Sequence, residues 1–181
     1  MPPDPHAAAL ALEEAGNLFA QANEQVVQAR TDQARDTFAH AAEVAERGLA
    51  MLTARGTPEE TELKTIASAA WLASGHPDRS EPHLAWLVGS IEDKSKPLAG
   101  LALVYLLEDR VGDSLAKSDE ALRHNPDAPE AHAVRGCALR KDGKPLEAAR
   151  EFRLAQANAE GPKVLPPWLI LVLSGIDCKP E

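Results

Sequence analysis

The stretch that decides the fold is PEAHAVRGCALRKDGKPLEAAREFRLAQANAEG, residues 129–161. Its pattern is typical of two helices joined by a tight turn, and Gly136 would let the two helices approach closely. Gly143 would relieve the turn between them. The second helix would place small residues at the crossing point and a large one where a gap must be filled. The residues that mark this pattern are Gly136, Leu139, Gly143, Ala148, Phe152 and Ala155.

The same six positions recur three times toward the N-terminus. A step of 34 residues reaches Ala102, Tyr105, Asp109, Ser114, Ser118 and Ala121. A second step of 34 reaches Ser68, Trp71, Gly75, Ser80, Leu84 and Leu87. A last step of 46 reaches Ala22, Gln25, Ala29, Ala34, Phe38 and Ala41, which we interpret as the same unit with a longer second helix. Such a period predicts a stack of similar helix pairs.

These residues resemble the tetratricopeptide repeat (TPR), a helix–turn–helix unit of 34 residues. The resemblance implies an all-α fold, a right-handed α-solenoid of antiparallel helix pairs in a single domain, 1–181. A generic bundle of helical hairpins is the alternative. The expected parts are about four repeats at 8–54, 58–92, 96–125 and 129–159, followed by a C-terminal capping segment or tail at 162–181.

One helix start is also readable in the sequence. Thr57 precedes Pro58, and Glu60 stands three residues after Thr57. A threonine N-cap, a proline at the first helical position and a glutamate at the third form the pattern of a capping box. We therefore expect a helix to begin at Pro58.

Composition argues against several classes of partner and location. The formal net charge is −9 and the acidic residues are spread along the chain, so we expect no nucleic-acid partner. The longest apolar run, residues 168–173, is far shorter than the roughly 20 residues of a membrane span. No basic residue precedes the first apolar stretch, so we expect no secretory signal and a cytoplasmic protein. Cys137 and Cys178 are too few for a disulfide framework, and we expect reduced thiols.

No residue pattern predicts an enzyme. The six histidines are scattered and do not join a cysteine or carboxylate at a recognised ligand spacing, so we interpret them as surface or turn residues. Cys137 lies inside a predicted helix without an identifiable base. We expect no catalytic residue, no metal and no cofactor.

The TPR resemblance implies that the first helix of each repeat lines a concave groove. This groove would be mainly apolar with a basic edge, and only Asn23 matches the Lys and Asn residues with which some TPR proteins grip a C-terminal carboxylate. An apolar floor favours a hydrophobic helix or extended segment as the ligand. The groove residues that we predict are Phe19, Asn23, Val26, Ala69, Leu72, Leu103, Leu106, Leu107, Cys137, Arg140 and Lys141.

The function that follows is a non-catalytic protein–protein interaction module, an adaptor, scaffold or chaperone that binds a segment of a partner polypeptide. In size and repeat number the chain resembles the small TPR chaperones of type III secretion. Two alternatives stay open. One is a small-molecule sensor or enzyme accessory subunit that uses the same pocket. The other is a self-assembling oligomer whose tail, residues 168–176, either caps the last repeat or occupies the groove as an autoinhibitory segment.

Overall fold

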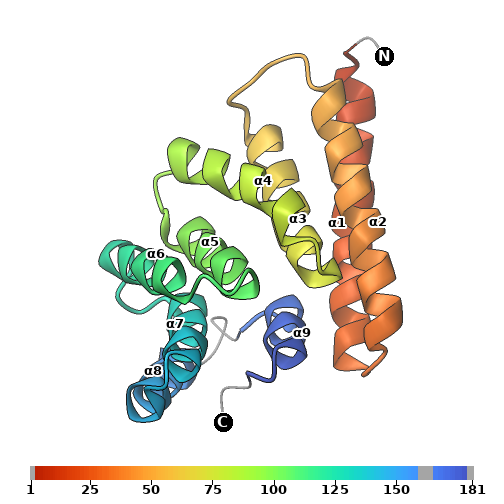
Figure 1. Ribbon diagram of the computed structural model, residues 1–181. Helices are drawn as coiled ribbons and strands as arrows, with labels where there is room; N and C mark the ends of the chain where they lie inside the picture. The colour runs from red at the N-terminus through yellow and green to blue at the C-terminus, as the bar shows by residue number, and fades with distance from the viewer. Residues whose placement is uncertain (1–2, 159–164, 179–181) are drawn as a thin grey trace. The chain divides into compact units, whose positions relative to one another are not determined.

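The computed structural model describes residues 3–158 and 165–178, and every regular element in them is a helix (Figure 1). Consecutive helices pack as antiparallel pairs, α1 with α2, α3 with α4, α5 with α6 and α7 with α8. The helices are α1 (Pro5–Val27), α2 (Thr31–Met51), α3 (Pro58–Ser74), α4 (Pro77–Ser90), α5 (Ser95–Leu107), α6 (Val111–His124), α7 (Pro129–Lys141), α8 (Pro145–Asn158) and α9 (Pro167–Gly175).

The chain divides into two compact units, Met1–Ser90 with α1 to α4 and Ile91–Glu181 with α5 to α9. Both units stack their helix pairs in the same way. The first helices of successive pairs are neighbours, α1 with α3 and α5 with α7, and each second helix packs on the next first helix within its unit. Each unit is therefore a two-pair segment of a helical repeat.

The turn inside every pair confirms the repeat register predicted from the sequence. The third of the six recurring positions has a positive φ in all four pairs, a left-handed conformation that closes the first helix. Two of these residues are glycines, for which this conformation carries no steric cost. The four values are Ala29 59°, Gly75 90°, Asp109 64° and Gly143 76°.

The predicted close approach of the last pair is also confirmed. A Cβ atom at Gly136 would lie 2.5 Å from Cε1 of Phe152, so only glycine lets the ring of α8 lie this close to α7. Ala148 and Ala155, on either side of Phe152 along the same stripe, are buried with it. Small and large side chains thus interlock at the crossing, as the sequence predicted.

The capping box at the start of α3 forms as predicted. The Thr57 hydroxyl accepts a hydrogen bond from the Glu60 amide at 3.2 Å. The Glu60 carboxylate reaches back and accepts one from the amide of Gly56 at 2.7 Å, one residue before the cap. These bonds satisfy amides that the first turn of a helix leaves without partners.

The most apolar helices are α5 and α9. Ten of the 13 residues of α5 are buried, including Leu103 and Leu106, so this helix has almost no solvent face. In α9, the buried residues are Leu169, Leu171, Val172 and Leu173. Among the described helices, none combines the length and apolar character needed to cross a membrane.

Candidate functional site

The C-terminal helix α9 packs on α7, the first helix of the last pair. Cys178, three residues after α9, forms a disulfide with Cys137 of α7, and their Cα atoms are 5.7 Å apart. Ala133 lies one turn before Cys137 on the same face of α7 and is fully buried. We call this face, defined by Ala133 and Cys137, the tail seat. Leu169 and Leu173, one turn apart in α9, are also fully buried.

The expectation of reduced thiols is wrong, because Cys137 and Cys178 are bonded to each other. The two cysteines are separated by 41 positions, and neither belongs to a spacing motif. Their pairing arises because the tail returns to the helix that carries Cys137. This long-range contact is a property of the fold, and a count of cysteines does not predict it.

The predicted groove residues of the second unit lie on two neighbouring first helices. Leu103 and Leu106 belong to α5 and are fully buried, whereas Leu107 is half-buried. Since α5 packs beside α7, these leucines and Cys137 lie on adjacent helices of one layer. Cys137 has the tail as its partner, so a segment of the chain already contacts this one predicted position.

The two residues of the predicted basic edge, Arg140 and Lys141, contact other side chains of the second unit. The guanidinium carbon of Arg140 lies 4.8 Å from the centre of the Phe152 ring, so Arg140 extends toward α8. The ammonium of Lys141 forms a 2.6 Å ion pair with Asp109, the turn residue of the preceding pair. Both side chains remain exposed, and each already contacts another part of the second unit.

The predicted groove residues of the first unit belong to α1 and α3. Phe19 meets Phe38 of α2 edge-on, with ring centres 5.3 Å apart, so it packs within its own helix pair. The Asn23 side-chain amide donates to the Phe19 carbonyl at 2.9 Å. The remaining three positions are Val26 and Ala69, which are half-buried, and Leu72, which is buried.

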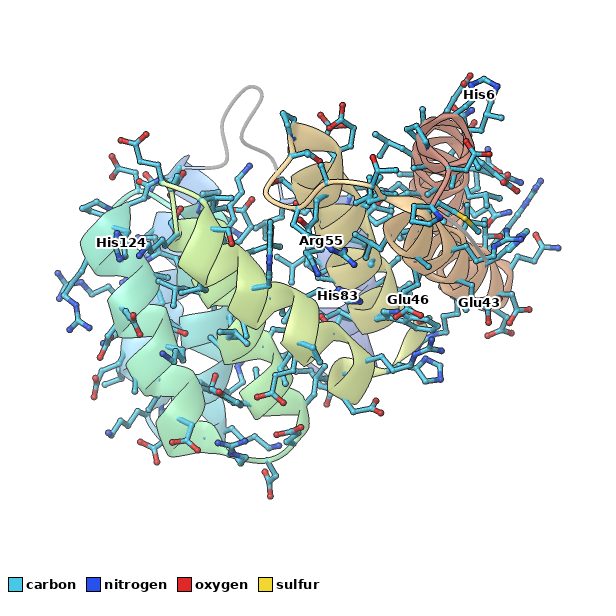
Figure 2. All side chains as sticks on the ribbon, turned by 90° about the horizontal axis from the view of Figure 1, so that it is seen from above. His6, Glu43, Glu46, Arg55, His83 and His124 are labelled. Carbon is cyan, nitrogen blue, oxygen red and sulfur yellow. A yellow bond between two sulfur atoms is a disulfide. The ribbon has the colours of Figure 1, made fainter. Side chains whose placement is uncertain are left out.

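A polar cluster centred on Glu46 links α2, α3 and α4 in the first unit (Figure 2). Trp71 Nε1 donates to one carboxylate oxygen at 2.9 Å, and Arg79 forms a 2.6 Å ion pair with the other. A ring nitrogen of His83 lies 3.3 Å from Glu46. Burial lowers the pKa of His83, and the hydrogen bond to Glu46 opposes that shift. The prediction that the histidines lie on the surface or in turns is wrong for His83, because helix packing encloses it.

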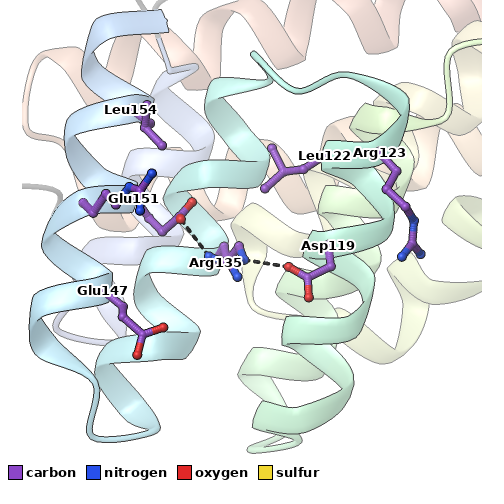
Figure 3. Close-up of a pocket in the computed structure, with 8 residues that line it drawn as sticks. Asp119, Leu122, Arg123, Arg135, Glu147, Glu151 and Leu154 are labelled. Atoms are coloured by element: carbon purple, nitrogen blue, oxygen red, sulfur yellow. Dashed lines mark hydrogen bonds and ion pairs between the residues drawn. The ribbon is translucent and has the colours of Figure 1, made fainter.

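A second polar cluster lies between α6, α7 and α8 (Figure 3). The buried carboxylate of Glu151 contacts Arg135 and the Nδ1 of His132, both at 2.7 Å. The other His132 nitrogen lies 2.8 Å from the Pro126 carbonyl. His132 is therefore buried and bonded on both sides, which again corrects the prediction of surface or turn histidines.

Beside this cluster is an open hollow of about 450 Å³. Arg135 lies in it with its ion-pair partners Asp119 and Glu151, as the dashed lines of Figure 3 show. The charges of these three side chains compensate one another. In the described part of the chain, no three His, Cys, Asp or Glu side chains are grouped so that they could hold a metal ion.

Comparison with solved structures identifies a similar fold in MamA, a TPR-like protein. A crystal structure of MamA has 14 % sequence identity and a TM-score of 0.53, and the match covers 82 % of this chain and 93 % of MamA. A second MamA structure, MSR-1, has 13 % identity and a TM-score of 0.52, with 81 % and 97 % covered. Neither a protein-family model nor a curated protein matches the sequence. At these identities the likeness shows the fold alone, a TPR-like helical repeat.

Proposed function

We propose that this chain is a non-catalytic protein-interaction module whose tail seat, together with the adjoining surface of α5, binds a short apolar helix. The observation that carries the proposal is α9. This helix of nine residues buries Leu169, Leu171, Val172 and Leu173 and packs on α7. A surface that holds this segment has the chemistry to hold a partner segment of the same kind, since burial of apolar area drives both associations.

The polar groups of the second unit support an apolar ligand over a charged one. Arg140 and Lys141, the predicted basic edge, already contact Phe152 and Asp109. In the charged hollow, Arg135 is held by two carboxylates. A site for a small charged molecule needs convergent polar groups, whereas Arg140, Lys141 and Arg135 each already contact another side chain.

In this proposal the chain's own tail occupies the tail seat, and a partner helix must displace it in order to bind. The Cys137–Cys178 disulfide keeps it in place by raising its effective concentration at the tail seat. A partner would therefore bind best after the disulfide is reduced. An adaptor, scaffold or chaperone role fits such displacement. The disulfide also argues for an oxidising environment, which does not fit the cytoplasmic location predicted from the sequence.

A peptide-binding measurement tests the proposal. The full-length chain carrying Cys178→Ser, Leu169→Ser and Leu173→Ser has a tail that no longer competes. A fluorescent peptide of residues 165–178, with serine in place of Cys178, should bind it. Adding Leu169→Ser and Leu173→Ser to the peptide should weaken binding at least about 100-fold, because each buried leucine contributes about 1.5–3 kcal/mol.

The matched control is a peptide with Ile170→Ser, because Ile170 of the same helix is 42 % exposed. This peptide should bind within a few-fold of the parent. Circular dichroism of the chain variant checks that its helices are retained. Equal loss for the Ile170 and leucine peptides, or no binding of the parent peptide to a folded chain, would contradict the proposal.

A further inference from the structure

Exposed large apolar side chains concentrate on α1 and α8, the helices at the outer sides of the first and last pairs. Single exposed apolar side chains are ordinary on a protein surface, so these two helices stand out only because charges beside those side chains have no ion-pair partner among the described residues. The remaining two in the described part of the chain, Ile170 and Ile176, belong to the tail region. The exposed fractions are 54 % for Leu10 and 74 % for Val27 in α1, and 87 % for Leu146 and 36 % for Leu154 in α8.

The exposed side of α1 is acidic. Most of its residues lie three, four or seven positions apart, and Glu13 and Glu14 are adjacent, so they form one stripe along the helix. The helix contains no lysine or arginine, and within the described residues none of its three glutamates takes part in an ion pair. We call this stripe the α1 face, made up of Leu10, Glu13, Glu14, Asn17, Glu24 and Val27.

The exposed side of α8 is basic. Arg150 and Arg153 lie on it, and neither forms an ion pair with any described residue. Glu147 lies beside Arg150 at the edge of the stripe, next to the hollow of Figure 3. We call this stripe the α8 face, made up of Leu146, Ala149, Arg150, Arg153, Leu154 and Ala157.

The two faces also match in spacing. On the α1 face, Leu10 precedes Glu14 by four residues, which is about one helical turn. On the α8 face, Leu146 and Leu154 lie four residues before and after Arg150. When Arg150 is opposite Glu14, a leucine of α8 therefore lies opposite Leu10 whether the two helices run parallel or antiparallel. Charge pairing and apolar contact are satisfied together.

We propose that the α8 face of one copy of this chain docks on the α1 face of a second copy. The α1 face of one copy then binds the α8 face of another copy, and charge as well as apolar area selects this pairing. The proposal is independent of the tail seat. It uses other helices, and it neither requires nor excludes displacement of α9.

This contact is heterologous, because the two partners contribute different surfaces. Two copies that pair both faces reciprocally form a closed dimer, whereas copies that pair one face each keep a free α1 face and a free α8 face and assemble into rings or filaments. One helix face against another buries a small area, and the contact is therefore weak and reversible. Salt should weaken it further, since the attraction is between exposed charges.

Sedimentation velocity of the full-length chain tests the proposal through a charge swap. At about 20 mM salt the average mass should rise with protein concentration, and about 500 mM salt should reverse the rise. The variant Glu13→Lys, Glu14→Lys has two basic faces, and the variant Arg150→Glu, Arg153→Glu has two acidic ones. Each variant alone should lose association at least about ten-fold. An equimolar mixture of the two should recover it, because every contact is again between opposite charges.

A matched pair of apolar variants completes the design. Leu146→Ser should weaken association, whereas Ile170→Ser, the same kind of apolar-to-polar change at an exposed residue of the tail, should leave it unchanged. Three results would overturn the proposal: a mass independent of concentration at low salt, association that survives in either charge variant alone, and a mixture no heavier than its components.

Discussion

The ring of Phe152 lies so close to Gly136 that a Cβ atom on this glycine would be 2.5 Å from the ring carbon Cε1. The contact joins α7 to α8 and depends on a residue without a side chain. A Phe ring can approach a helix backbone in this way only where the facing position is glycine. Gly136 and Phe152 therefore both mark the sequence repeat and form a packing contact that stabilises the last helix pair.

Gly136→Ala should lower the free energy of unfolding by about 1–3 kcal/mol, because the added methyl overpacks the crossing. Urea denaturation followed by circular dichroism measures the change. Gly16→Ala is the control, since nothing lies within 4 Å of a Cβ at Gly16 in the middle of α1. That variant should gain up to about 1 kcal/mol from helix propensity. Equal effects of the two substitutions would show that the Phe152 contact is unimportant.

Ala29→Gly should raise the free energy of unfolding by about 1 kcal/mol. Ala29 has a φ of 59°, a left-handed conformation that costs an alanine about 1–2 kcal/mol and a glycine very little. Gly143→Ala makes the reverse change at the same repeat position and should destabilise by a similar amount. Thermal denaturation of both variants checks the pair. A loss of stability in Ala29→Gly would contradict a left-handed turn at this residue.

Stability should fall as the pH falls below about 6.5, and His83 should account for part of the loss. Its pKa is lowered in the folded chain by burial, against a value of 6.5 without that environment. The unfolded chain therefore binds a proton first, and protonation favours unfolding. This contribution is complete above pH 6.5 and is lost as the pH drops toward the folded-state pKa.

Unfolding free energies measured at several pH values between about 5 and 7 test whether His83 causes part of the pH dependence. His83→Gln, which keeps a polar contact with Glu46, should make the pH dependence shallower. His124→Gln, at an exposed position of α6, is the comparison variant for the loss of a histidine. An identical slope in the His83 variant would assign the pH dependence to other groups.

Reduction of the Cys137–Cys178 disulfide should destabilise the docked tail by about 4 kcal/mol, as loop-closure entropy predicts for a loop of this length. Hydrogen exchange of the reduced and oxidised chains measures the effect locally. The amides of α9 should exchange faster after reduction, whereas those of α2 in the first unit serve as the internal control. Unchanged protection of α9 would mean that apolar packing alone fixes the tail.

The helix pairs could be predicted from the sequence because their signals are local. Small, large and turn residues recur at fixed offsets, and the positive φ values at Ala29, Gly75, Asp109 and Gly143 follow that register. Asp109 adopts the same left-handed conformation as Gly75 and Gly143, so the position in the repeat sets this conformation even where the residue is not glycine. The capping box at Thr57 was equally readable, since all its members lie within four residues of one another.

The disulfide and the polar clusters could not be predicted, because they join residues far apart in the chain. Cys137 and Cys178 are 41 positions apart, and His132 meets Glu151 across a helix pair. One signal did point to the tail, namely an apolar run too short for a membrane span. It indicated that residues 168–176 pack against protein, either as a cap on the last repeat or in the groove, but it did not distinguish between these two positions.

The most direct test of the tail seat compares one labelled peptide, residues 165–178 with serine in place of Cys178, against two forms of the full-length chain. One form has the Cys137–Cys178 disulfide intact, and the other carries Cys178→Ser. We predict at least about ten-fold tighter binding to the Cys178→Ser chain, because its own tail can leave the tail seat. Equal affinity for both folded chains, or binding to neither, would contradict the account.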